Sequence, residues 1–366
     1  MTPSLSLYFD FVRALAAIVV VLHHYSQHLV KAEFGRVVFP HLGQEAVITF
    51  FVLSGFVISW VVDTKCPSVE EFLTKRLARF YSVMVPAIAI LGLCYLVTMQ
   101  LEPQLYRYQG DGEYFWLKSL FTLGFLNFNA VVYQVKLPGG SPFWSLTYEF
   151  WYYVVFALWV FSKRRWLASA GTASVFVLLG WDAFLLWPVW LTGVAIYRLS
   201  KRITLTPAQA QVLFGLSLSL MVSLYLSGWR YSVLSLATYI DSANSLRYAQ
   251  AAPYFLALGC LMGINFLAVK SWSVQRQLML PTLVEQEIRH LAGVSFTLYL
   301  THVPLMLLLR GGLRGYGFPF LIPALAILIV YWIGRPIENS KTFYRQALQT
   351  LGQQLATIAP FLGNRA

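Results

Sequence analysis

Apolar runs about as long as a membrane is thick recur along nearly the whole chain. A helix that crosses the hydrocarbon core of a bilayer needs about 20 mostly apolar residues. Hydrophobic residues make up 58% of the 366 residues and charged residues only 11%, a balance unlike that of soluble domains. The sequence therefore predicts an all-α polytopic membrane protein. The clear candidate crossings are Leu7–His28, Ala46–Val62, Phe80–Met99, Pro142–Phe161, Pro207–Leu226, Ala249–Val269, Ala292–Leu309 and Phe318–Gly334.

Two further stretches complete the predicted topology. Trp166 to Tyr197 is long enough for two short helices around Gly180, which brings the predicted number of crossings to about ten. Tyr114 to Tyr133 is interrupted by Lys118 and two asparagines, so we expect it to be re-entrant or to lie at the interface. Nothing before Val30 has the pattern of a cleaved signal peptide, so the first helix is expected to be retained.

Clusters of Lys and Arg between the apolar runs indicate the orientation. Lys163–Arg165 and Arg198–Arg202 are examples, and such clusters are typical of cytoplasmic loops. We therefore expect both termini in the cytoplasm, a membrane domain over residues 1–340, a short cytoplasmic tail over 341–366, and a location in the inner (cytoplasmic) membrane.

The same charge distribution argues against some functions. The net charge of +12 lies in short clusters and not on one face of a folded domain, so nucleic acid is not an expected partner. Three widely spaced cysteines favour neither a disulfide framework nor a metal site. His24 and His28 have a spacing that could suit a metal, but no third ligand is suggested nearby, and we expect none.

The first apolar run carries ionisable side chains that are costly inside a membrane. Arg13 and His24 are 11 residues apart, so they project from nearly the same face of a helix, roughly 16 Å apart along its axis. Asp10 could pair with Arg13. Such residues are candidates for function, but Arg13 could equally extend to the inner interface and the histidines to the outer one.

Five motifs together resemble one family. They are DFVRALAAIVVVLHH (from Asp10), GQEAVITFFVLSGFVIS (from Gly43), KRLARFYSVMVPA (from Lys75), PFWSLTYEFWYY (from Pro142) and SFTLYLTHVP (from Ser295). In this order they are similar to the membrane acyltransferase 3 family. Its members have about ten membrane helices and O-acylate surface polysaccharides, lipopolysaccharide, peptidoglycan or small molecules, with cytoplasmic acyl-CoA as the donor.

The resemblance assigns roles residue by residue. The family's Arg and His on the first helix fall on Arg13 and His24, and its Arg-x-x-Arg pair falls on Arg76 and Arg79. Its Trp-Ser-Leu-x-x-Glu motif and its Tyr-Leu-x-His-x-Pro motif supply the remaining positions, which are Trp144, Ser145, Glu149, Tyr299, His302 and Pro304. The chain reads DFVRA where the family usually has DGLRG, and Ala46–Ile48 where it usually has Gly-Val-Asp, differences that bear on the acceptor.

These assignments predict an acyl transfer. A neutral imidazole at His24 suits a general base, and we expect Glu149 to orient it, with His302 beside them in one outer cavity. Arg76, Arg79 and Lys75 would bind the phosphates of acetyl-CoA, with Arg13 farther along the donor. Trp144, Ser145 and Tyr299 would contact substrate.

Other interpretations stay open for the same residues. The arginines could be positive-inside anchors, His302 a core histidine, and the aromatic run from Pro142 an interfacial belt. The expected partners are acyl-CoA, a glycan or lipid-linked saccharide acceptor, and membrane lipids. A small-molecule acceptor, a secondary transporter and a non-enzymatic scaffold are the alternatives.

Overall fold

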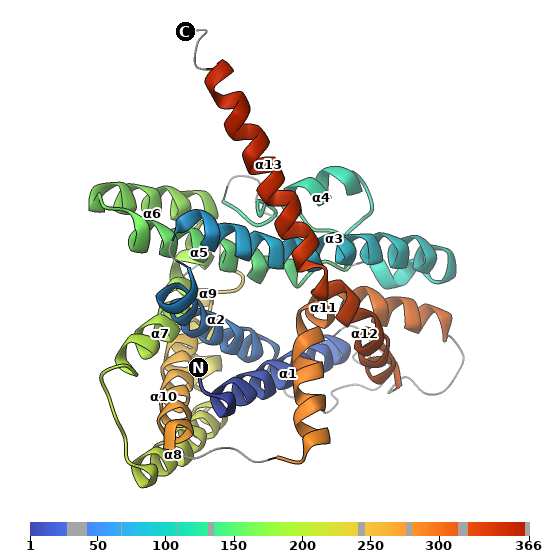
Figure 1. Cartoon of the computed structure of the whole chain (residues 1–366). Helices are drawn as coiled ribbons and strands as arrows, with labels where there is room; N and C mark the ends of the chain where they lie inside the picture. Colours follow the sequence, from blue (N-terminus) through green and yellow to red (C-terminus); the bar gives the residue numbers. More distant parts are fainter. Residues whose placement is uncertain are drawn as a thin grey trace.

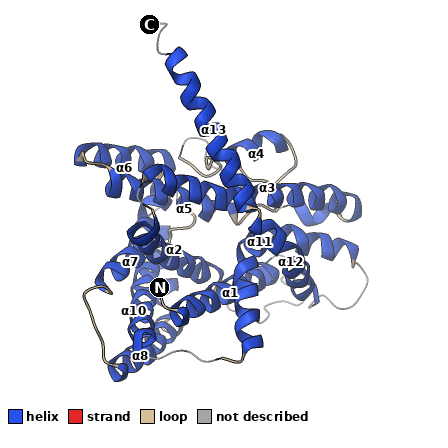
Figure 2. Cartoon of the chain, in the orientation of Figure 1, coloured by secondary structure: helices blue, strands red, loops and turns tan. Residues whose placement is uncertain are grey.

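Every regular element in the described part of the chain is a helix (Figures 1 and 2). The computed structural model describes residues 1–27, 42–66, 68–107, 109–130, 135–240, 246–275, 280–313 and 321–362. The α-helices are α1 (Pro3–Tyr25), α2 (Gly43–Lys65), α3 (Val69–Leu101), α4 (Phe115–Leu123), α5 (Phe143–Phe161), α6 (Arg165–Leu179), α7 (Trp181–Leu199), α8 (Pro207–Leu226), α9 (Trp229–Ile240), α10 (Ala252–Gln275), α11 (Thr282–Gly312), α12 (Leu321–Asn339) and α13 (Lys341–Leu362), and a short 3-10 helix, η2, spans Pro103–Tyr106.

Seven stretches among the described residues are long and apolar enough to cross a membrane. They are α1, α2, α3, α8, α10, α11 and the stretch Leu321–Gln354, which joins α12 to the first part of α13. Three of the predicted crossings correspond instead to α5 and α7, with 19 residues each, and to α6, with 15. The chain is thus an all-helical, multi-pass membrane protein, while the count of ten and the side on which the termini lie stay predictions.

Two helices begin well before the runs that predicted them. Helix α3 starts at Val69 because Ser68 caps it, its side chain accepting a hydrogen bond from the Glu71 backbone N–H at 3.2 Å. Helix α11 starts at Thr282, ahead of the predicted Ala292. In both cases the early turns are charged, so an apolar run marks only the later part of the helix. The predicted ends at His28, Tyr133 and Phe318 lie outside the described residues.

The stretch expected to be re-entrant does not form one membrane-length helix. After the nine residues of α4, the chain from Gly124 to Ala130 is irregular and mostly buried. Side chains of α5 hold it there, since Thr147 Oγ1 donates to Asn127 Oδ1 at 2.6 Å and Trp151 Nε1 donates to the Phe125 carbonyl at 2.9 Å. Its depth in a membrane stays a prediction.

Small residues let α2 and α7 approach each other closely at the centre of the bundle. A Cβ added to Gly55 would lie 2.2 Å from the Trp190 carbonyl oxygen, and one added to Gly193 would lie 2.0 Å from that of Val52. Only glycine allows backbones to meet in this way. The pair is a fixed support for the site that α2 helps to line.

Helices α1 and α11 are tied at two points, which follow in the same order along both helices. Asp10 pairs with Arg289 at 3.3 Å, and 14 residues later on α1 the ring of His24 meets that of His302. Helix α11 bends between these contacts, and Figure 1 shows it as two limbs that meet beside its label. Helix α13 packs its first turns on α3 and then extends away from the bundle.

Candidate active site

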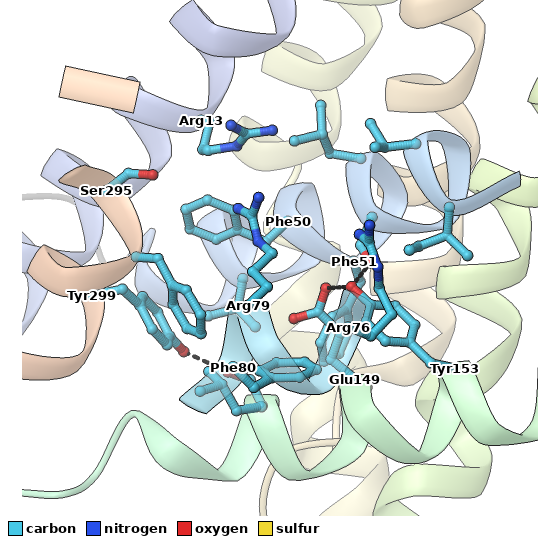
Figure 3. Close-up of a pocket in the computed structure, with 18 residues that line it drawn as sticks. Arg13, Phe50, Phe51, Arg76, Arg79, Phe80, Glu149, Tyr153, Ser295 and Tyr299 are labelled. Carbon is cyan, nitrogen blue, oxygen red and sulfur yellow. Dashed lines mark hydrogen bonds between the residues drawn. The ribbon is translucent and has the colours of Figure 1, made fainter. Parts of the chain in front are cut away.

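Five helices enclose a cavity of ≈ 120 Å³ in which arginines and one carboxylate converge. Helix α1 supplies Arg13, α3 supplies Arg76 and Arg79, α5 supplies Ser145 and Glu149, and α11 supplies Ser295 and Tyr299 (Figure 3). Side chains of α2, among them Phe50, Phe51 and Ser54, form the opposite wall. The five resemblance motifs, on five different helices, therefore meet at one place.

The three guanidinium groups give this cavity a positive character. Arg13 pairs with Asp10 at 3.5 Å, and Asp10 is shared with Arg289. Arg79 lies between Arg13 and Glu149 in Figure 3, and it acts electrostatically on Arg13 and on Arg76. The Nε atom of Arg76 is buried and has no hydrogen-bond partner among the described residues. Buried guanidinium groups with spare donors favour an anionic ligand, which arginine binds through paired hydrogen bonds.

Glu149 belongs to this arginine cavity and not to the histidines. Its carboxylate accepts a hydrogen bond from the hydroxyl of Tyr153, one helical turn along α5. That hydroxyl also lies 2.9 Å from Ser54 Oγ, which in turn accepts from Trp190 Nε1 at 3.2 Å. The chain of contacts fixes the carboxylate against α2 and α7.

The arginine cavity does not bring Glu149 together with His24 and His302, and the expected grouping of all three in one outer cavity stays a prediction. Neither histidine lines the cavity that contains Glu149. The depth expected for Glu149 assumes that α5 begins at the membrane surface, but α5 begins inside the bundle. A Cβ added to Gly139 would lie 3.5 Å from Pro304, which is eight residues before the end of α11. Glu149 consequently lies deeper, beside the arginines.

His24 and His302 form a pair of their own. Nε2 of His302 lies 3.2 Å from Nδ1 of His24, and His302 is fully buried. The Nδ1 atoms also lie 3.0 Å from backbone carbonyls, that of Leu298 for His302 and that of Val20 for His24. A carbonyl can only accept, so Nδ1 of His302 carries a proton, and Nδ1 of His24 carries one that it shares between the Val20 carbonyl and Nε2 of His302. This network assigns the neutral tautomer of His24 whose Nε2 is unprotonated.

Tyr299 and Ser145 lie between the cavity and the histidine pair. The two hydroxyl oxygens are 2.7 Å apart, and both residues line the cavity. The ring of Tyr299 is 6.4 Å from that of His302, centroid to centroid, and 5.8 Å from that of Phe50. These side chains connect the arginine cavity to the histidine pair.

Two predicted site residues lie elsewhere. Lys75 pairs with Glu71 at 2.7 Å and donates to the Lys65 carbonyl at 3.1 Å, and it does not line the cavity. Trp144 does not line the cavity and stacks on Tyr248, with ring centroids 4.0 Å apart. Both are held by contacts that the sequence pattern does not reveal.

Glu338 on α12 has no predicted role from the sequence, but it contacts the helix that carries Tyr299 and His302. Its Oε1 accepts hydrogen bonds from the backbone N–H groups of Phe296 and Thr297, each at 3.1 Å, and from Thr297 Oγ1 at 3.4 Å. Backbone N–H groups that turn to a side chain mark the start of a helix, so Glu338 caps the second limb of α11, which carries Tyr299 and His302. It also acts electrostatically on Arg13. The signal available in the sequence was a lone carboxylate just past an apolar run.

Comparison with known proteins identifies the family of this chain. A family model described as an acyltransferase domain, of the acyltransferase 3 type, matches residues 6–334. This chain belongs to the acyltransferase 3 family. The match runs from α1 into α12 and ends just before Glu338. In this acyltransferase 3 chain, all five motifs contribute to the arginine cavity, and the histidine pair comes from the ends of two of them.

One curated relative aligns with part of the chain. The chain is 30% identical over 149 residues to a protein named Acyltransferase MdmB from Streptomyces mycarofaciens. The aligned part is 37% of this chain and 35% of the relative, so about a third of each protein is compared. No solved structure matches the chain.

Proposed function

We propose that this protein is a membrane-embedded O-acyltransferase. It moves an acetyl group from cytoplasmic acetyl-CoA to a hydroxyl of an extracytoplasmic or lipid-linked glycan, in the inner membrane, with His24 as general base. The observation that carries the proposal is the connection of an arginine-lined cavity, through Tyr299 and Ser145, to a histidine pair whose tautomer suits a base. Acyl transfer needs a cationic site for the anionic donor, which the arginine cavity offers, and a base for the acceptor hydroxyl, which the histidine pair offers.

The arginine cavity suits the donor. Arg76 and Arg79 lie in the early part of α3, where guanidinium groups can bind phosphate oxygens in pairs. Arg13 is 11 residues before His24 on α1, about 16 Å along the axis. That length is comparable to the pantetheine arm of CoA, so a donor bound by its phosphates at the arginines can present its thioester toward the histidines.

The histidine pair suits the transfer step. As the acceptor oxygen attacks the thioester carbonyl carbon, Nε2 of His24 takes the hydroxyl proton, a C–O bond forms and the C–S bond breaks. The CoA thiolate that leaves recovers the proton from the imidazolium. His302 Nε2 accepts from Nδ1 of His24, which holds the ring in place and stabilises its positive charge. Tyr299 and Ser145 are placed to contact the reacting groups.

The decisive experiment replaces His24. His24→Ala should abolish acetyl transfer by the purified chain while the affinity for acetyl-CoA, measured by calorimetry, stays within about twofold, since the arginine cavity is unchanged. His23→Ala is the matched control on the same helix, because the His23 ring packs against Gly43 and does not meet His302. Full transfer by His24→Ala would refute the base.

The same measurement separates the alternatives. A secondary transporter would neither bind nor consume acetyl-CoA, whatever the state of His24. An enzyme with a small-molecule acceptor would consume acetyl-CoA in a His24-dependent manner but would leave the surface glycans unmodified. Mass spectrometry of glycans from cells with and without the gene distinguishes these outcomes.

A further inference from the structure

A second cavity, of ≈ 170 Å³, lies where three non-helical segments of the chain meet. One segment is the irregular stretch that ends at Ala130, the second is the break at Gly180 between α6 and α7, and the third leads from Arg247 into α10. Gly180 has φ of 85°, a conformation that favours glycine. In membrane proteins, irregular backbone gathers where it lines a cavity.

This cavity lies at the same end of the bundle as His24. Gly43 at the start of α2 packs against His23, next to His24. Helix α7 runs parallel to α2, since the later residue Tyr197 donates to Asp63 near the end of α2 at 2.7 Å. The first residues of α7, which line the second cavity, therefore lie at the His24 end.

A buried carboxylate fixes the shape of the cavity. Asp182 Oδ1 accepts from three successive backbone N–H groups, those of Arg247, Tyr248 and Ala249, at 3.1, 2.9 and 2.7 Å. These contacts clamp the loop before α10 onto the start of α7. The lining is preformed, because it does not depend on a ligand to hold the loop.

Aromatic rings form its walls. Tyr248 is held by stacking on Trp144, with centroids 4.0 Å apart and planes 6° from parallel. The Trp181 side chain lines the same cavity and is 67% exposed. Flat rings held in place present faces to which the C–H groups of a sugar ring can pack.

Polar groups accompany the rings. Tyr148 is only 3% exposed and lines the cavity, yet none of the hydrogen bonds in the described part of the chain involves its hydroxyl. A hydroxyl that has no partner among the described residues and borders a cavity is available to a ligand in that cavity. Arg247 and Asn129 line the same cavity.

We propose that this cavity is a carbohydrate subsite that holds a sugar residue of the acceptor glycan. The inference rests on the proposed transferase function, since it assigns the acceptor of that reaction to a carbohydrate. Trp181 and Tyr248 pack on the sugar ring, and the hydroxyl of Tyr148 donates to one of its hydroxyl oxygens. A longer glycan is thereby held while another of its residues reaches the histidine pair.

The test uses the full chain in lipid nanodiscs. The donor is acetyl-CoA, and the acceptor is oligosaccharide released from the surface of the producing cell and treated with alkali to remove its ester groups. Trp181→Ala removes an exposed ring, and Tyr148→Phe removes only the hydroxyl. Trp166→Ala is the matched control, because its ring is 64% exposed at the start of α6, outside this cavity.

We expect each of the two variants to raise the acceptor KM about 10-fold, as loss of one good contact does, with an unchanged dissociation constant for acetyl-CoA. The control should match the wild type. An unchanged acceptor KM in Trp181→Ala and in Tyr148→Phe would overturn the subsite. If the wild type transfers no acetyl group to any hydroxyl compound, the proposed function fails instead, and a wild type that acetylates only non-carbohydrate acceptors overturns the subsite alone.

Discussion

Glu338 offers the sharpest test of how the fold positions the histidine pair. Glu338→Ala removes the acceptor for two backbone N–H groups and one hydroxyl at the start of the second limb of α11. Loss of a helix cap costs about 0.5–2 kcal/mol, and a buried N–H left without a partner costs about 1–3 kcal/mol. That limb carries Tyr299 and His302, so the loss falls on the geometry of the site.

Acetyl transfer by Glu338→Ala is expected to fall about 10- to 100-fold, since each 1.4 kcal/mol corresponds to a factor of ten. Glu338→Gln keeps an acceptor oxygen and loses only the charge, which is worth about 0.3–1 kcal/mol at a helix start. Its rate should stay within about fivefold of the wild type. The affinity for acetyl-CoA should persist in both variants because the arginines of the cavity are intact.

The assay measures the transfer rate at saturating acetyl-CoA, with gel filtration of the detergent-solubilised protein to check folding. Glu287→Ala is the matched control, since this carboxylate accepts from Tyr331 at 2.9 Å on the exposed side of the same helix pair. If Glu338→Gln is as slow as Glu338→Ala while both are folded, hydrogen bonding to α11 is not the role of Glu338.

Three further predictions follow from other contacts. Arg79→Lys should weaken acetyl-CoA binding about 10-fold in calorimetry because it loses paired hydrogen bonding, whereas Arg165→Lys on α6 should bind normally. Tyr299→Phe removes the hydroxyl that meets Ser145 at 2.7 Å and should lower the transfer rate about 3- to 10-fold without changing folded yield; an unchanged rate would show that this contact is not used. Gly193→Val should abolish folded protein, since its Cβ would lie 2.0 Å from the Val52 carbonyl oxygen, whereas Gly215→Ala, with no atom within 4 Å, should fold normally.

The helices could be predicted where their residues are apolar for a full membrane thickness. That criterion fails at α3 and α11, whose first turns are charged. It also fails to show that α11 bends, because the bend depends on Glu338, a residue 41 positions beyond Thr297. Caps supplied by another helix leave no local pattern.

The candidate site was predictable only in part for a similar reason. Motif resemblance selected Arg13, Arg76 and Arg79, and the structure places all three in one cavity. It gave no depth for Glu149, because counting residues from a helix end assumes that the helix begins at the membrane surface. The irregular chain before α5 enters the bundle first, so a count from the surface places Glu149 too close to that surface, whereas the carboxylate lies beside the arginines.

The relation between the arginines and the histidines follows from how α1 and α11 are tied. A slip of one helix past the other by a single turn, about 5.4 Å, would break the Asp10–Arg289 pair and the His24–His302 contact together. The two ties therefore fix the register of α1 against α11, and with it the position of His302 beside His24. The bend capped by Glu338 lies between the two ties, so it sets the direction of the limb that carries His302 without altering the spacing along α1. Donor reach would then depend on α1, and the alignment of the base on α11 and α12.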